Sequence, residues 1–559
     1  MTGILPNLDT RVVERVTVAM RDGVRLGGVL YRASAAEPGP VLLVRTPYSE
    51  PLSRALPVQP ALDAGFVVLV QDCRGTGRSE GEFRTFENER ADGLDTLDWL
   101  RGQPWCAGKI VMFGQSYLGM VQLAVAGDRP AGLAAIATTV TPDDYRDGLA
   151  YRQGAFQLGQ ALAWHLMKAA QALGDAAARG TDVAAPMADL LALTRDTEAA
   201  YRALPLSDRP GIANVLPSWH TWLSEEDSPG YWRDISYAGR TPAVPGLHVG
   251  GWFDLFLRGT LNNFTATPGQ HLIVGPWSHV DQTGVVGEVF YAGGAAQAIQ
   301  LEQQQLRFLR ESVDGVPTSL PPVRIYVMGA DRWRVEQEWP LARTDWQTWY
   351  LGADGSLGHD VPAAGTAEFV HDPRDPVPTV GGAILMAGSR DGRLGYQPGS
   401  RDRRELDDRR DILRFTSAVL TEDVEVTGPV SVTLHAATSA ADTDFTAVLV
   451  DVHPDGRAMG VTDGIVRARY RHGMDTAAPV VPGEVYEYTI DLGATSQVFQ
   501  AGHRVRVDVA SSNFPCYDRN SGSGRPAGQV TEDDFVTATQ QIFFGRMRPS
   551  SIRLPVIPA

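Results

Sequence analysis

The motif GQSYLG at residues 114–119 holds the side chain of this 559-residue chain that is best placed to act as a nucleophile. An apolar strand predicted at 109–113 runs into the motif, and helical periodicity over 117–126 follows it. A serine on such a strand-to-helix turn is held with its hydroxyl exposed, beside a backbone N–H that points at a reacting carbonyl. The second glycine stands one place later than in the common G-x-S-x-G pattern. We interpret Ser116 as a candidate nucleophile for acyl transfer.

Two other residues could form a triad with this serine, which needs a base to accept its proton and an acid to orient that base. On a strand-to-helix turn of this kind the partners follow in the order Ser, Asp, His. Asp254 follows a predicted strand within GGWFD, and His279 follows the next strand within GPWSH. Active sites of open parallel sheets lie at the carboxyl ends of the strands. We therefore predict that Ser116, Asp254 and His279 meet there.

Stabilisation of a tetrahedral oxyanion needs a second donor besides the backbone N–H of Tyr117. The chain has no HGGG-type loop to supply one. A strand predicted at 40–44 instead ends in RTPY, and the hydroxyl of Tyr48 is a donor at neutral pH. We predict that Tyr48 donates to the oxyanion, and simple packing of its ring is the alternative interpretation.

The elements that must position these residues alternate between strand and helix. Continuous apolar strands with helical patterns between them are typical of a parallel sheet covered on both faces. Between residues 143 and 240 the strand signals vanish, and helical spacing indicates an inserted cap. Past about residue 345, short alternating strands separated by turn residues favour an antiparallel sandwich or jelly roll. The predicted boundaries are 1–143 and 241–345 for the α/β domain, 144–240 for the cap and 346–559 for the β domain.

The charge balance argues against some partners. Fifty Lys and Arg against 66 Asp and Glu give a net charge of −16, which repels phosphate backbones and anionic membrane surfaces. No apolar run approaches the roughly 18 residues of a membrane span, and the first residues lack a basic-then-apolar leader. The three cysteines show no metal-ligand spacing. We expect a cytoplasmic protein that binds neither nucleic acid nor membranes.

Several further motifs extend across the chain. They are RTPY at 45–48, QDCRGTGRSEG at 71–81, DTDFTAVLVDVHPDG at 442–456 and SSNFPCYDRN at 511–520. Together with GQSYLG, GGWFD and GPWSH, they make the chain resemble the bacterial cocaine esterase and X-Pro dipeptidyl-peptidase family of α/β-hydrolases, which also includes α-amino-acid ester hydrolases. The resemblance implies an α/β-hydrolase domain with an inserted helical cap, followed by a C-terminal all-β jelly-roll domain.

The resemblance also assigns roles. Ser116 would be the nucleophile, His279 the base and Asp254 its orienting acid, with Tyr48 and the N–H of Tyr117 as oxyanion donors. The family's reaction is acyl transfer to water through an acyl-enzyme, without a metal or organic cofactor. Family members often self-associate, which favours a homodimer.

The predicted substrate class depends on a departure from the family pattern. The amino-acid ester hydrolases carry acidic residues two and three positions after the triad Asp, where this chain has Phe256 and Leu257. We therefore expect a small ester with an uncharged aromatic or aliphatic acyl group, although each aromatic could equally belong to the core. The predicted acyl pocket consists of Phe156, Trp164, Trp252, Phe253 and Phe256.

Two alternative functions fit the same sequence. An X-Pro dipeptidyl-peptidase would act on short peptides and must bind a free N-terminal amine, for which the cap carboxylates Asp144 or Asp147 could serve. An alternative of another class makes the C-terminal β domain a carbohydrate-binding module.

Overall fold

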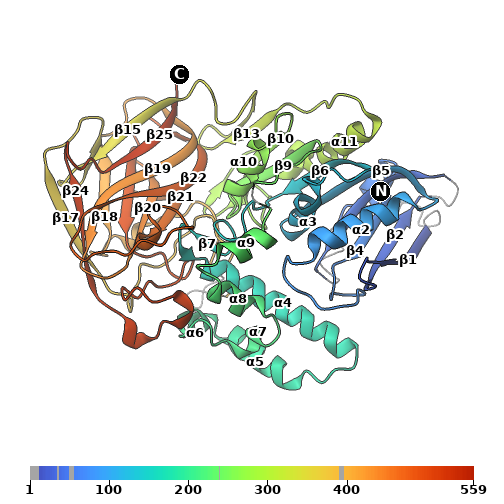
Figure 1. The fold of residues 1–559 in the computed structure, drawn as a ribbon. Helices are drawn as coiled ribbons and strands as arrows, with labels where there is room; N and C mark the ends of the chain where they lie inside the picture. The colour runs from blue at the N-terminus through green and yellow to red at the C-terminus, as the bar shows by residue number, and fades with distance from the viewer. Residues whose placement is uncertain (1–11, 34–36, 49–55, 238, 389–395, 559) are drawn as a thin grey trace, which may run out of the picture.

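The structure is a computed structural model that describes residues 12–33, 37–48, 56–237, 239–388 and 396–558. An α/β domain, a helical cap and a C-terminal β domain lie side by side (Figure 1). In these described ranges, no helix is both long enough and apolar enough to cross a bilayer.

A central sheet forms the α/β domain, and ten strands belong to it in the described part of the chain. The strands from β4 to β13 in sheet order pair in parallel, whereas β1, β2 and β14 add antiparallel strands at the two edges. Every residue of β4 and β9 is buried, which explains their uninterrupted apolar sequences. In sheet order the strands are β1 (Val12–Ala19), β2 (Arg25–Arg32), β4 (Val67–Asp72), β3 (Gly39–Thr46), β5 (Cys106–Gln115), β6 (Leu133–Thr139), β9 (Gly246–Phe253), β10 (His271–Ser278), β13 (Val323–Val327) and β14 (Arg332–Glu336).

Helices cover this sheet. Two pairs of helices are in contact, α2 with α3 and α1 with α11. A further helix, α10, lies against β9. α3 begins directly after the turn that holds Ser116. The helices are α1 (Val58–Asp63), α2 (Glu89–Arg101), α3 (Tyr117–Ala126), α10 (Leu257–Thr265) and α11 (Leu301–Asp314), with a small hairpin of β11 (Val285–Val286) and β12 (Val289–Phe290) and the 3-10 helix η3 (Ala296–Ile299) between β10 and α11.

The cap is helical, with one correction to the sequence prediction. A short hairpin, β7 (Tyr151–Arg152) and β8 (Ala155–Phe156), stands where no strand was expected. Its two turn residues, Gln153 and Gly154, both have positive φ, as in the tight turns that match strand twist. Strands of two residues are too short to show a periodicity. The cap helices are α4 (Leu158–Ala178), α5 (Ala184–Arg195), α6 (Thr197–Arg202), α7 (Pro210–Ala213), α8 (Ser218–Ser224) and α9 (Pro229–Ile235).

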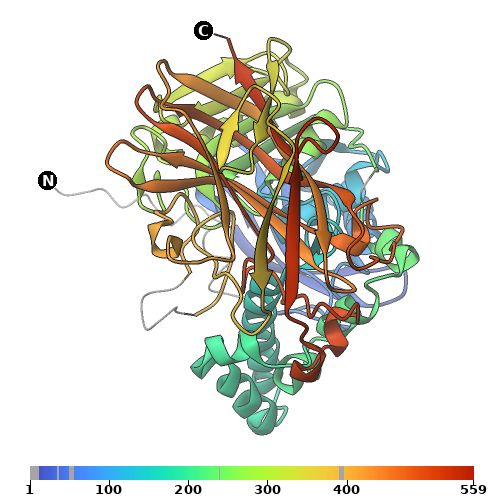
Figure 2. The ribbon, with the colours of Figure 1, turned by 90° about the vertical axis from the view of Figure 1, so that its left-hand side faces the viewer.

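The C-terminal domain is all β, as predicted, and closes around its own apolar core. Figure 2 shows it in front of the α/β domain with the cap helices below. Its β22 contacts β13, β9 and α10, so the domain is packed onto the α/β domain. Within the domain, the buried Arg467 pairs with Asp444 and Asp518. Asp518 in turn accepts a hydrogen bond from the cap, at the N–H of Phe156.

Eleven strands of this domain fall within the described residues. They are β15 (Asp345–Leu351), β16 (Ser356–Gly358), β17 (Gly365–His371), β18 (Leu413–Ser417), β19 (Val424–Thr438), β20 (Asp444–Val452), β21 (Ala458–Arg467), β22 (Tyr486–Phe499), β23 (Arg504–Ala510), β24 (Ala538–Phe544) and β25 (Ser551–Ile557), with 3-10 helices η4 (Arg404–Leu406), η5 (Ala468–Tyr470), η6 (Ala527–Gln529) and η7 (Glu532–Asp534).

Candidate active site

The turn between β5 and α3 holds Ser116 at φ +56° and ψ −124°, a strained conformation for a residue with a side chain. A Cβ at Gly114 would lie 2.4 Å from the Cβ of Leu118, so that position must remain glycine. At Gly119 a Cβ would lie 2.0 Å from the Oγ1 of Thr141. This close approach of α3 to the loop after β6 explains why residue 119 is glycine.

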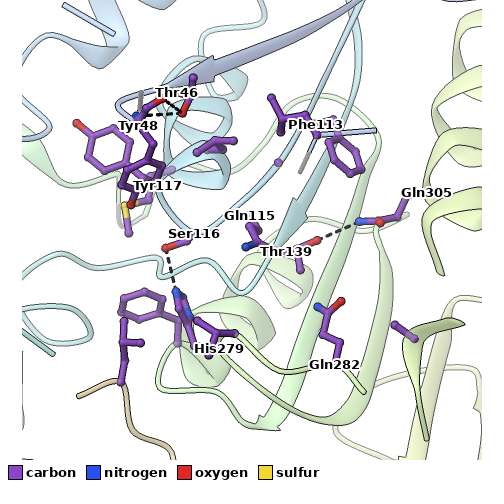
Figure 3. A pocket seen from close by; sticks show the side chains of 18 of the residues that line it. Thr46, Tyr48, Phe113, Gln115, Ser116, Tyr117, Thr139, His279, Gln282 and Gln305 are labelled. Atoms are coloured by element: carbon purple, nitrogen blue, oxygen red, sulfur yellow. Dashed lines mark hydrogen bonds between the residues drawn. The ribbon is translucent and has the colours of Figure 1, made fainter. Parts of the chain in front are cut away.

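A chain of hydrogen bonds joins the three predicted triad residues (Figure 3). The Nε2 of His279 lies 3.0 Å from the Oγ of Ser116, and its Nδ1 lies 2.8 Å from the Oδ1 of Asp254. Asp254 and His279 are buried, and Ser116 is half-buried. The arrangement fits a hydroxyl whose proton can pass to a neutral imidazole.

Strand register brings the acid and the base together. β9 and β10 run parallel, and Phe253 at the end of β9 pairs with Ser278 at the end of β10. Asp254 directly follows β9 and His279 directly follows β10, so the two side chains lie side by side. Both stand at the carboxyl edge of the sheet, where β5 also ends. The ring of Phe256 stands edge-on to the imidazole of His279, with centroids 5.2 Å apart, and limits its rotation.

Tyr48 follows β3 at the same edge of the sheet. Its hydroxyl oxygen accepts a hydrogen bond of 3.2 Å from the Nε1 of Trp164 on α4. That bond occupies a lone pair, so the hydroxyl proton stays available for another acceptor. Burial raises the pKa of Tyr48 to about 12, which keeps the hydroxyl protonated at neutral pH.

Tyr117 offers its backbone N–H rather than its side chain. The N–H lies in the first turn of α3, where amides have no acceptor within the helix. The side-chain hydroxyl donates instead to the Oε1 of Glu89 at 2.9 Å. Glu89 also pairs with the fully buried Arg45 at 3.0 Å. This buried network fixes the start of α3 and therefore the direction of the N–H.

A cavity of about 800 Å³ opens above Ser116. Aromatic rings form one wall, where Trp164 stacks between Tyr117 and Trp222. Glutamines form much of another wall, and Gln305 donates to Thr139 (Figure 3). Of the described residues that line the cavity, Glu302 alone carries a carboxylate.

Two of the five predicted acyl-pocket aromatics, Trp164 and Phe256, line this cavity, and three do not. Phe156 is fully buried in the cap core between Tyr151 and Trp219. Trp252 and Phe253 lie within β9 and therefore pack in the core that covers the sheet, below the edge on which the site is built. Other apolar residues that no sequence motif indicated also line the cavity, namely Phe86, Leu149, Met167, Trp222 and Leu385.

The topology and the serine elbow at the carboxyl edge of the sheet define an α/β-hydrolase. Residues 22–281 match the model of X-Pro dipeptidyl-peptidase (S15 family), and residues 314–553 match that of the X-Pro dipeptidyl-peptidase C-terminal non-catalytic domain. The chain is 38% identical over 577 residues to a cocaine esterase of Rhodococcus sp. (strain MB1 Bresler), covering 98% of each chain.

Solved structures agree with this assignment. An aminopeptidase from a marine sediment Thaumarchaeota archaeon superposes with a TM-score of 0.84 at 25% identity, covering 99% of this chain and 98% of that one. An α-amino acid ester hydrolase superposes with a TM-score of 0.81 at 25% identity over the whole of both chains. The chain belongs to the S15 family and is one of its serine hydrolases, which confirms the family and fold predicted from the motifs.

Proposed function

We propose that this protein hydrolyses carboxylic esters through an acyl-enzyme on Ser116. The observation that carries the proposal is the hydrogen-bonded chain from Ser116 through His279 to Asp254, which opens onto a cavity walled by aromatic rings. His279 accepts the serine proton as the Oγ attacks the ester carbonyl, and then gives it to the departing alcohol. Water attacks the acyl-enzyme by the same route, while Asp254 holds the imidazole in the required tautomer.

The negative charge that develops on the carbonyl oxygen is stabilised by two donors in this proposal. The hydroxyl of Tyr48 and the N–H of Tyr117 come from separate strand ends that meet at the serine. Both donors are fixed before the substrate arrives, by Trp164 and by the buried Glu89 network respectively. Such donors cost little reorganisation during the reaction.

The acyl group in this proposal is uncharged and aromatic or aliphatic. The cap carboxylates that could have held an N-terminal amine have other partners: Asp147 pairs with Arg258, and Asp144 accepts from the N–H of Arg146. Neither one lines the cavity. The dipeptidyl-peptidase alternative therefore lacks the carboxylates that were expected to serve it. The name of the Rhodococcus relative, cocaine esterase, also favours an ester.

The test is a side-by-side assay of an aryl ester and an X-Pro anilide, with Ser116→Ala as the control. We expect turnover of the ester that is lost in the variant, and a fluorophosphonate adduct on Ser116 in the wild type by mass spectrometry. Labelling of another serine would refute the nucleophile. Faster cleavage of the anilide, or of a free N-terminal amino acid amide, would establish a peptidase instead.

A further inference from the structure

Two histidines and an aspartate gather on one face of the C-terminal domain, far from Ser116 in the sequence. Asp451 lies near the end of β20, and His453 follows two residues later, so both side chains point to the same face. β20 pairs antiparallel with β23, with Val452 opposite Arg504. Continuing that register places His453 opposite His503, which makes the three side chains neighbours on a single face.

The side-chain distances agree with the register. The Nδ1 of His503 lies 2.7 Å from the Oδ1 of Asp451, and the Nε2 of His453 lies 3.9 Å from its Oδ2. The two imidazole rings have centroids 4.3 Å apart. One donor atom from each of the three residues lies within 4.8 Å of the other two. A metal ion could contact all three after small side-chain movements.

The three side chains line a cavity of about 380 Å³ between the C-terminal domain and the α/β domain. Phe253, Glu288 and Asp331 of the α/β domain line the same cavity. Among its described lining residues are therefore three carboxylates and one arginine, Arg457. Arg457 pairs with Asp455 in its own turn and lies 3.4 Å from the Nδ1 of His453. Glu288 is paired with Arg401.

No lysine or arginine of the described residues forms an ion pair with Asp451. Its carboxylate is almost completely buried, and within the described residues its ion-pair partners are the two imidazoles, with the amide of Gln497 3.3 Å from Oδ2. A buried carboxylate among neutral groups is costly, and a bound cation would offset that cost. Two imidazole nitrogens with one carboxylate oxygen suit Zn²⁺ and related transition-metal ions, whereas Ca²⁺ and Mg²⁺ prefer oxygen ligands alone.

We propose that Asp451, His453 and His503 form a binding site for a divalent transition-metal ion, with Zn²⁺ as its natural candidate. The cavity leaves room for water to complete the coordination. A bound ion would cross-link the turn between β20 and β21 to the start of β23, at the interface with the α/β domain. The metal site is separate from the esterase site and does not depend on the proposed function.

The test uses the untagged full chain, stripped with EDTA and titrated with ZnCl₂ by calorimetry. We expect one equivalent of Zn²⁺ to bind with a Kd of about 1 µM or tighter, and the ion to raise the melting temperature. His453→Asn and Asp451→Asn should weaken binding at least about 100-fold. The matched control is His435→Asn, because His435 also faces a carboxylate, that of Glu487 at 3.7 Å, but has no second imidazole beside it. This control should bind Zn²⁺ as the wild type does.

A second readout is independent of affinity. Co²⁺ added to the wild type should give visible d–d bands that Zn²⁺ displaces, and these bands should be absent in His453→Asn. His453 is half-buried in a turn, where asparagine is well tolerated, so this variant decides the question even if Asp451→Asn fails to fold. Absence of stoichiometric binding to the wild type, or unchanged binding in His453→Asn, would overturn the site.

Discussion

Two His–Asp pairs of nearly identical geometry lie in different domains of this molecule. The Nδ1 of His279 lies 2.8 Å from Asp254, and the Nδ1 of His503 lies 2.7 Å from Asp451. In the first pair the Nε2 of His279 is hydrogen-bonded to Ser116, which lies on a strained turn. In the second pair a further imidazole stands beside the carboxylate. The third member, and not the pair itself, determines what chemistry each site can support.

The cavities beside the two pairs differ in the charge and polarity of their lining residues. The cavity at Ser116 is rich in aromatic and glutamine side chains and has one carboxylate, Glu302, among its described lining residues. The described lining of the cavity at Asp451 includes three carboxylates. We therefore assign uncharged acyl groups to the first site and a cation to the second.

The largest effect is expected at the nucleophile. Ser116→Ala and His279→Ala should each lower kcat for an ester by about 10⁴- to 10⁶-fold, because the attacking group or its base is lost. The measurement is steady-state ester hydrolysis, with circular dichroism to show that the variants are folded. Residual activity within tenfold of the wild type in either variant would remove that residue from the mechanism.

The orienting acid should come next. Asp254→Asn should lower kcat by about 10⁴-fold, because an amide at this position favours the wrong imidazole tautomer. The side chain keeps its size, so the melting temperature should change little. A loss of activity that accompanies unfolding would instead indicate a structural role.

Tyr48 should have a smaller effect. Tyr48→Phe removes one oxyanion donor and keeps the ring, so kcat should fall by about 10² to 10³, or roughly 3 to 4 kcal/mol. Burial raises the pKa of Tyr48 to about 12 because it disfavours the phenolate, so the hydroxyl remains a donor well above neutral pH. The pH profiles of the wild type and the variant should therefore share the same shape up to pH of about 10. Activity within twofold of the wild type would leave Tyr48 as a packing residue.

The substrate preference tests the charge of the first cavity. A charged amine there would lose hydration without a nearby buried acid, whereas an aromatic acyl group gains about 25 cal/mol for each Å² that it buries. The kcat/KM for a benzoyl or phenylacetyl ester should exceed that for the matching α-amino ester about tenfold or more. A tenfold preference for the amino ester would favour the peptidase alternative.

The sequence predicted those parts of the site that lie at strand ends. Ser116, Asp254 and His279 could be placed together because their strands are long, apolar and parallel, and the fold fixes which edge carries the site. Phe86 and Trp222 could not be assigned to the cavity, because their meeting depends on how the cap packs on the sheet. The prediction that Phe253 lines the acyl pocket was wrong for a similar reason. Phe253 precedes Asp254 in the chain, but its side chain packs in the core beside the sheet.

The cluster at Asp451 was also beyond the sequence analysis. His453 and His503 have no recognisable metal-ligand spacing, and they become neighbours through the register of β20 and β23. Such a register is set by the turns and the core of a whole sheet. Cross-strand clusters of this kind therefore emerge from structures rather than from motifs.

The smallest effect is expected when the substitution made at Asp254 is repeated in the second pair. Asp451→Asn, assayed in EDTA, should leave kcat for the ester within about twofold of the wild type, because Asp451 contacts neither the substrate cavity nor the triad. Its asparagine oxygen can still accept from His503, so the change replaces a charge-assisted hydrogen bond with a neutral one. In the metal-free protein the exchange also removes the cost of a buried charge among neutral groups, so the free energy of unfolding, measured by urea denaturation, should stay within about 1 kcal/mol of the wild type. The same chemical change would thus remove catalysis at one His–Asp pair and leave both turnover and stability nearly unchanged at the metal-free second pair. A large loss of ester turnover in Asp451→Asn would show that the two pairs are not independent.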